Sequence, residues 1–196
     1  MSNSTTKLDD RDIIRRFNEG DIAVFSTLVD RYSQRAYQIA YGILRNPEDA
    51  QEVAQDVFVR IYKALPSFRG DAEFTTWMYR IAANLAKNKY RWNRSRGIQR
   101  EVSIDEPQET EEGGEVKFDV PEPRSRPDEE TAVSELQERI AQEIEKLPPA
   151  YREALVLRNF KELSYEEIAS VVGCKLGTIK SRIARAREEL RRRLEL

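Results

Sequence analysis

The feature that most constrains the fold is the stretch from residue 101 to residue 128, which lacks the composition of a folded core. It combines a Gly113-Gly114 pair with four prolines and a dense set of acidic residues, and it holds few apolar side chains. A segment with many like charges and little apolar surface cannot offset the entropy cost of folding. We therefore predict a flexible acidic linker over residues 101–128, with one domain on each side, over residues 8–100 and 129–196.

Apolar residues on both sides of the linker recur at steps of three and four, which is the period of an amphipathic helix. No segment alternates with period two, so strands are not expected. The stripe of residues 50–65 is the most regular: Ala50, Val53, Ala54, Val57, Phe58, Ile61 and Leu65. Further stripes predict a short helix near residues 13–17, a second helix over residues 25–43, and a long helix beginning near Thr75. The predicted fold class is all-α, with two small helical domains.

The C-terminal domain contains the pattern of a helix-turn-helix. Ser164 and Glu167 have the spacing of a capping box, Gly173 suits the turn, and Gly177 with Thr178 is predicted to let the second helix start close to its neighbour. The apolar residues Ile179, Ile183, Ala186, Leu190 and Leu194 predict the inward face of that second helix. The opposite face carries Thr178, Ser181, Arg182 and Arg185. Arginine and hydroxyl side chains on such a face suit phosphates and base edges of a major groove.

The long helix after Thr75 is strongly basic, since residues 74–100 contain no acidic side chain. Arg80, Asn84, Lys87 and Arg91 fall on one face at steps of four, three and four. Aromatic residues interleave with these cations: Phe68, Phe74, Tyr79, Tyr90 and Trp92. This composition is typical of surfaces that bind single-stranded nucleic acid. Aromatic residues at helical spacing are more often core, and for Phe74 and Trp77 individually the core is the favoured interpretation.

Composition excludes several kinds of site. The 196-residue chain has no histidine and one cysteine, which excludes Cys/His zinc sites, histidine acid–base catalysis and internal disulfides. We expect no metal and no cofactor. The N-terminus is polar and no apolar run has the length of a membrane span, so a soluble, cytoplasmic protein without membrane insertion is expected.

Four blocks of the chain together resemble an extracytoplasmic-function (ECF) sigma factor of the sigma-70 family. They are residues 49–58 (DAQEVAQDVF), residues 68–71 (FRGD), the segment from Thr76 to Asn88, and the helix-turn-helix from Ser164 to Arg187. The blocks occur in the family's order and cover both predicted domains. The resemblance implies a non-enzymatic factor that binds core RNA polymerase, directs it to promoters and initiates transcription.

The resemblance also implies a role for particular residues of this sequence. In the N-terminal domain, region 2, the polymerase-binding residues would be Asp49, Glu52, Gln55 and Asp56. The melted, single-stranded minus-ten element would be captured by Phe68, Asp71, Phe74, Arg80, Asn84 and Lys87. In the C-terminal domain, region 4, the duplex minus-thirty-five element would be read by Thr178, Lys180, Ser181, Arg182 and Arg185. Control by an anti-sigma factor is the family expectation. Two positions depart from the usual pattern: Glu73 places a carboxylate in the capturing loop, and Lys180 stands where an arginine is common.

Two alternatives come from other functional classes. A conventional transcriptional regulator would use the helix-turn-helix on duplex DNA without being a polymerase subunit. A metal-dependent nuclease would use Asp49, Glu52 and Asp56 as ligands at helical spacing, although no lysine or histidine pattern nearby supports catalysis.

Overall fold

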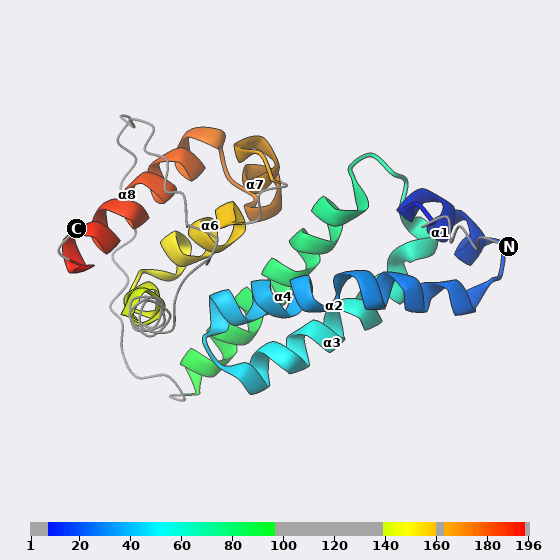
Figure 1. Cartoon of the computed structure of the whole chain (residues 1–196), viewed down its shortest axis with the longest axis horizontal. Coiled ribbons are helices and arrows are strands. Elements are labelled where there is room, and N and C mark those ends of the chain that lie inside the picture. The colour runs from blue at the N-terminus through cyan, green and yellow to red at the C-terminus, as the bar shows by residue number, and fades with distance from the viewer. Residues whose placement is uncertain (1–7, 97–138, 160–162, 195–196) are drawn as a thin grey trace, which may run out of the picture. The chain divides into compact units, whose positions relative to one another are not determined.

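The structure is a computed structural model that describes residues 8–96, 139–159 and 163–194 (Figure 1). The chain divides into two compact units between Arg96 and Gly97, and each unit is described here by itself. All regular elements of the described residues are helical, which confirms the all-α fold class. The predicted linker at residues 101–128 lies outside the described residues, as do the predicted domain limits at residues 100 and 129. None of the described helices has the length and hydropathy needed to cross a membrane.

The first unit has a long helix for each of the longer predicted stripes. Its elements are α1 (Asp10–Asn18), the 3-10 turn η1 (Ile22–Val24), α2 (Phe25–Leu44), α3 (Pro47–Ala64), the 3-10 turn η2 (Leu65–Ser67) and α4 (Phe74–Ser95). The predicted start of the long helix near Thr75 is correct to within one residue.

The corner between α2 and α3 is built by residues suited to it. Arg45 takes the left-handed conformation with φ of 55° and ends α2. Asn46 then caps α3 by accepting a hydrogen bond from the backbone N–H of Asp49 at 2.8 Å. Pro47 occupies the first helical position, where its missing N–H has no partner to lose.

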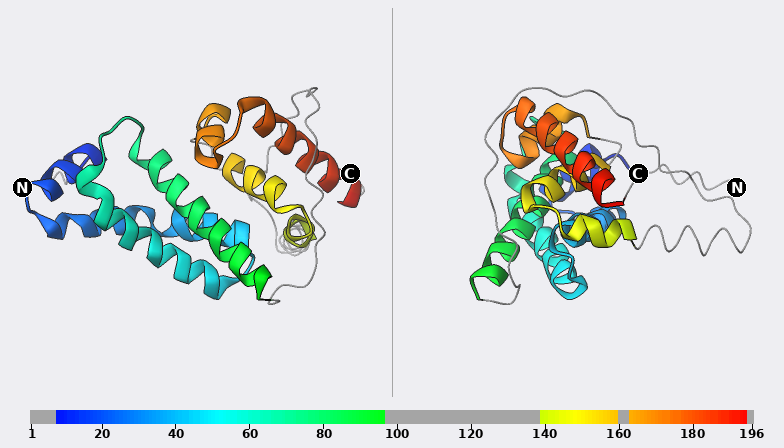
Figure 2. Two further views of the ribbon diagram at one scale, coloured as in Figure 1. Left: turned by 180° about the vertical axis from the view of Figure 1, so that it is seen from behind. Right: turned by 90° about the vertical axis from the view of Figure 1, so that its left-hand side faces the viewer.

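The core of the first unit lies between α2, α3 and α4, which pack against one another (Figure 2). Leu28 and Ile39 from α2, Ile61 from α3, and Met78 and Tyr79 from α4 are fully enclosed. Apolar stripes of this kind supply most of the stability of a helical bundle.

α1 is joined to α2 by a polar contact. Arg31 and Tyr32 of α2 both donate hydrogen bonds to the carboxylate of Asp10, in the first turn of α1. Arg31 also donates to the backbone oxygen of Leu8 at 2.7 Å. Burial and the bond to Asp10 raise the pKa of Tyr32 above its ordinary value. The contact holds α1 in place beside the bundle.

The second unit is described from residue 139 onward. Residues 139–145 are helical, and they are followed by α6 (Pro149–Asn159), α7 (Tyr165–Val172) and α8 (Leu176–Leu194). Leu147, Leu155 and Ala186 form a core against which Leu190 packs. Arg152, only 4% exposed, closes the corner before α6 by donating to the backbone oxygens of residues 144, 145 and 147.

Candidate nucleic-acid interface

Three aromatic rings gather where the loop after η2 enters α4. The ring centroids of Phe68 and Trp77 are 4.8 Å apart, and Phe74 lies 6.1 Å from Phe68 and 5.9 Å from Trp77. Phe74 is only 3% exposed, whereas Phe68 and Trp77 are half-buried. Tyr32 lies behind Phe74, with 5.5 Å between the ring centroids. The accessible ring surface therefore belongs to Phe68 and Trp77, with Phe74 supporting them from the core.

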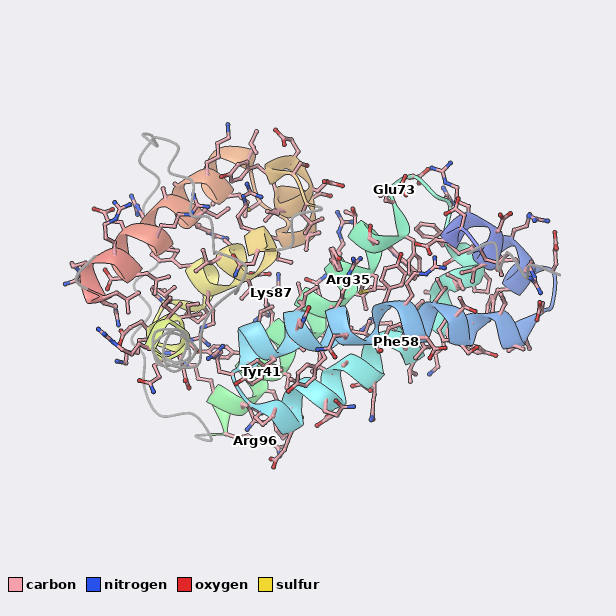
Figure 3. All side chains as sticks on the ribbon, viewed as in Figure 1. Arg35, Tyr41, Phe58, Glu73, Lys87 and Arg96 are labelled. Carbon is pink, nitrogen blue, oxygen red and sulfur yellow. The ribbon has the colours of Figure 1, made fainter. Side chains whose placement is uncertain are left out.

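The loop that precedes α4 carries two exposed carboxylates. Asp71 lies next to Gly70, whose φ of 75° is in the left-handed region that favours glycine. Glu73 immediately precedes α4 and forms an ion pair with Arg11 of α1, with 3.2 Å between oxygen and nitrogen (Figure 3). An ion pair this exposed contributes little to stability. It does draw the Glu73 carboxylate toward α1.

The residues predicted to follow the captured strand continue along α4. Arg80, Asn84 and Arg91 are exposed and Lys87 is half-buried, so these side chains reach the surface as the periodicity predicted. Figure 3 places Glu73 and Arg96 at the two ends of α4, with Lys87 between them. Phe74 and Trp77 of the ring cluster and the cations that follow them therefore belong to one helix, and Phe68 joins them from the loop.

The polar face of α3, to which the resemblance assigns polymerase binding, has partners within the chain at its first turns. The Asp49 carboxylate accepts a 2.7 Å hydrogen bond from Asn93 of α4 and lies 3.3 Å from the Lys89 ammonium. Glu52 accepts from the same Lys89 at 2.6 Å. These two carboxylates, Glu52 first, raise the pKa of Lys89. The metal-ligand alternative is weakened, because both carboxylates already surround an ammonium group.

Gln55, in contrast, borders a groove between α2 and α3, and Asp56 is exposed beside it. The groove has a volume of about 520 Å³, and its lining combines apolar and polar side chains: Val29, Ser33, Gln34, Tyr37, Gln51, Ala54, Gln55 and Phe58. Farther along α3, Val59 is 52% exposed and Tyr62 is also exposed. This outer face thus offers both apolar and polar side chains, a combination found in protein-binding surfaces.

The helix-turn-helix has the local geometry that its sequence predicted. The Ser164 hydroxyl accepts from the backbone N–H of Glu167, and the Glu167 carboxylate accepts from the backbone N–H of Ser164, which completes the capping box. Gly173 ends α7 with φ of 80° and ψ of 41°. The prediction for Gly177 was wrong: a Cβ at this position would meet no atom within 4 Å, so no close approach requires glycine.

The predicted reader residues of α8 lie outside its buried stripe, with Lys180 on one flank and Arg182 on the other. Ile179, Ile183, Ala186 and Leu194 are buried, as expected, and Leu190 is partly buried against the core. Lys180 is exposed, whereas Thr178, Ser181, Arg182 and Arg185 are half-buried. The Ser181 hydroxyl donates to the backbone oxygen of Thr178 at 3.0 Å, so toward DNA it is available as an acceptor.

Sequence reasoning missed three residues that organise these surfaces. Lys89 and Asn93 meet the start of α3 from α4, and Tyr32 joins the aromatic cluster to Asp10. In the sequence, Lys89 and Asn93 are four residues apart and so lie on the same side of a helix. This spacing is the signal that could have indicated a common contact, which the structure shows to be Asp49. No group of three or more potential metal-binding side chains occurs in the part of the chain that the structure describes.

Comparison with known proteins identifies both units. The family model for Sigma-70 region 2 matches residues 28–96, and the model for Sigma-70, region 4 matches residues 137–190. The RNA polymerase sigma-H factor of Pseudomonas aeruginosa is 36% identical over 190 residues, which cover 97% of this chain and 96% of that protein. The ECF RNA polymerase sigma-E factor of Escherichia coli K12 is 38% identical over 184 residues, covering 94% of this chain and 93% of the relative.

Solved structures show the same architecture. CnrH, in complex with the cytosolic domain of CnrY, has a TM-score of 0.65 and 27% identity, covering 95% of this chain and 97% of that one. The sigma factor RpoE of Bartonella quintana, in complex with the anti-sigma factor NepR, has a TM-score of 0.63 and covers 88% of this chain and 97% of its own. Its identity is 22%, so this likeness concerns the fold.

The sequence relatives and the family models agree over both units. Sigma factors are not enzymes, and the relatives that are named ECF factors span nearly the whole chain. The chain therefore belongs to the ECF sigma factors of the sigma-70 family and is an alternative sigma factor.

Proposed function

We propose that this sigma factor binds core RNA polymerase through the outer face of α3 and directs it to promoters with two separate elements. The first unit captures melted non-template bases of the minus-ten element, and the second reads the duplex minus-thirty-five element. The protein acts as a polymerase subunit in the cytoplasm, without catalysis of its own. The aromatic cluster at the start of the acid-free helix α4 is the observation that carries this proposal.

Capture of a single strand needs ring faces for bases and cations for the backbone. Phe68 and Trp77 offer partly exposed rings, and Arg80, Asn84 and Lys87 follow along the same helix. Stacking of a base on an aromatic ring is worth roughly 1–3 kcal/mol, which is comparable to the few kcal/mol needed to unstack and unpair a base. The cluster can therefore stabilise an opened strand by binding alone, without a catalytic step.

Duplex reading by α8 follows from its position in the helix-turn-helix. Lys180, Arg182 and Arg185 lie outside the buried stripe, with Lys180 and Arg182 on its two flanks. Arginine can contact a guanine edge through two parallel hydrogen bonds, whereas the lysine ammonium acts as a point charge. We expect Arg182 and Arg185 to contribute more base selectivity than Lys180.

Polymerase docking is assigned to the groove between α2 and α3 and to its edge. Gln55 and Asp56 are exposed there, and Phe58 with the exposed Val59 supplies apolar surface. Glu52, although paired with Lys89, has a side chain 58% exposed and can contribute from its open side. Asp49 faces α4 and has the least surface to offer, with a side chain 21% exposed.

An anti-sigma factor is the proposed regulator. The complexes of CnrH with the cytosolic domain of CnrY and of RpoE with NepR supply the precedent within this fold. A partner that covered the α2–α3 groove would compete directly with the polymerase.

The test is in vitro transcription from a promoter library with purified core polymerase. The unaltered protein is compared with Asn84→Ala, in the middle of α4, and with the control Asn18→Ala, an exposed amide at the end of α1. We expect initiation at a shared two-part motif, loss of open complexes for Asn84→Ala, and no change for Asn18→Ala. A protein that shifts duplex DNA alone, while core polymerase gains no promoter selectivity from it, would instead be a conventional regulator.

A further inference from the structure

The apolar support of α4 ends well before the helix does. Its buried residues from Phe74 to Ala86 face α2 and α3, but from Lys87 to Ser95 the sole buried residue is Asn93, which is 3% exposed. At 1.5 Å per residue this last part extends the helix by roughly 12 Å. It includes Lys87 and Arg91, the last two cations of the predicted strand-binding face. Tyr90 is half-buried, but no apolar side chain of this part is fully buried, so polar contacts carry much of its attachment.

The polar anchor of this helix end is Asp49. One carboxylate oxygen accepts from the Asn93 amide at 2.7 Å, and the other lies 3.3 Å from the Lys89 ammonium. Both side chains come from the end of α4, one turn apart. An amide that is buried in this way loses its hydration, so removal of its partner is costly.

The anchor is itself fixed in position. Asp49 lies in the first turn of α3, and its backbone N–H is held by the Asn46 side chain at 2.8 Å. A carboxylate at this place is favoured by the helix dipole. The Asp49 side chain is therefore held from its own helix before it contacts α4.

We propose that Asp49 is a positioning residue for the nucleic-acid-binding face of α4, acting through Asn93 and Lys89. Because residues within one helical turn rotate together, holding residues 89 and 93 fixes the direction of Lys87 and Arg91. The inference rests on the proposed strand-binding role of α4. It gives Asp49 a task in DNA opening that differs from the polymerase contact predicted from the sequence.

The test separates anchoring, polymerase binding and promoter opening in the full chain. The variants are Asp49→Asn, Asn93→Asp and the double exchange, which restores an amide–carboxylate pair with donor and acceptor reversed. Glu48→Gln is the matched control, because Glu48 is an exposed carboxylate in the same turn of α3. For each variant we would measure amide hydrogen exchange of residues 87–95, affinity for core polymerase, and open-complex yield per bound holoenzyme on a promoter selected by the unaltered protein.

We expect both single variants to exchange faster at residues 87–95 and to lose open complexes by about tenfold. Asp49→Asn exchanges a charge-assisted hydrogen bond for a neutral one and removes the ion pair with Lys89, and Asn93→Asp sets two carboxylates against each other. Affinity for core polymerase should stay within about twofold of that of the unaltered protein, because the end of α4 is displaced and the rest of the unit stays folded. The double variant should recover most of both losses, and Glu48→Gln should match the unaltered protein. A positioning role predicts this recovery.

Unchanged exchange at residues 87–95 in Asp49→Asn would overturn the proposal. A fall in core affinity that equals the fall in open complexes, with no recovery in the double variant, would also overturn it and assign Asp49 to polymerase docking. If the unaltered protein opened no promoter at all, the proposed function would fail. The hydrogen-exchange result alone would then decide whether Asp49 anchors the end of α4.

Discussion

Gly173 and Gly177 stand four residues apart in the helix-turn-helix, and the structure predicts opposite effects for the same substitution. Gly173 has φ of 80° in the left-handed region, whereas Gly177 lies in the first turn of α8 without a positive φ. At both positions a Cβ would meet no atom within 4 Å. Steric clash is therefore absent, and the backbone conformation alone decides the outcome.

The magnitudes follow from that difference. An L-residue in the left-handed conformation costs roughly 1–2 kcal/mol, and the reduced freedom of the unfolded chain returns about 0.4–1 kcal/mol. Gly173→Ala should therefore destabilise the second unit by about 1 kcal/mol. Alanine is preferred over glycine in a helix interior by roughly 0.5–1 kcal/mol, and Gly177 is only the second residue of α8. Gly177→Ala should therefore stabilise the unit by up to about 0.5 kcal/mol.

The assay is denaturant unfolding of the full chain with a separate probe for each unit. Both tryptophans, Trp77 and Trp92, belong to the first unit, so tryptophan fluorescence is an internal control that neither substitution should change. Hydrogen exchange of the α7 and α8 amides reports the second unit. The reasoning is refuted if Gly173→Ala is as stable as the unaltered protein, or if both substitutions move the stability in the same direction.

Two further predictions concern buried polar contacts. Arg152→Lys should destabilise the second unit by about 2 kcal/mol, because a lysine ammonium cannot reproduce the fork that bonds the carbonyls of residues 144, 145 and 147. Hydrogen exchange of the α6 amides measures this loss of stability. Exchange protection equal to that of the unaltered protein would refute the prediction. The raised pKa of Tyr32 means that its contribution to stability is complete below pH of about 10 and is lost as the pH rises toward the folded value. Tyr32→Phe should therefore lose less stability than the unaltered protein between pH of about 9 and 11, as measured by urea unfolding, and equal losses would contradict the assignment.

The sequence was sufficient for the elements that depend on local or periodic signals. The spacing of Val53, Val57 and Ile61 predicted the buried side of α3, and the capping box from Ser164 to Glu167 predicted the start of α7. These signals act over three or four residues, so one segment contains all the information they need.

Contacts between distant residues could not be predicted in this way. Asp49 and Asn93 are separated by 44 positions, and their pairing depends on how α3 and α4 pack. The sequence gives no sign that Asp49 and Glu52 contact α4, because an unpaired carboxylate and a paired one look alike in a helical repeat. The same reason explains why the bond between Tyr32 and Asp10 was missed.

The contact between α1 and α2 sets a limit on how region 2 could be exchanged between sigma factors. The family match begins at residue 28, but Arg31 and Tyr32 depend on Asp10 and on the Leu8 carbonyl, which lie before that limit. A chimera joined at residue 28 would lack Asp10 and Leu8 of this chain, so the buried Tyr32 hydroxyl and the Arg31 guanidinium would lose these acceptors. The Tyr32 ring is the one that packs against Phe74. A transplantable module of this protein therefore begins at Leu8, some twenty residues before the range that the region 2 family model matches.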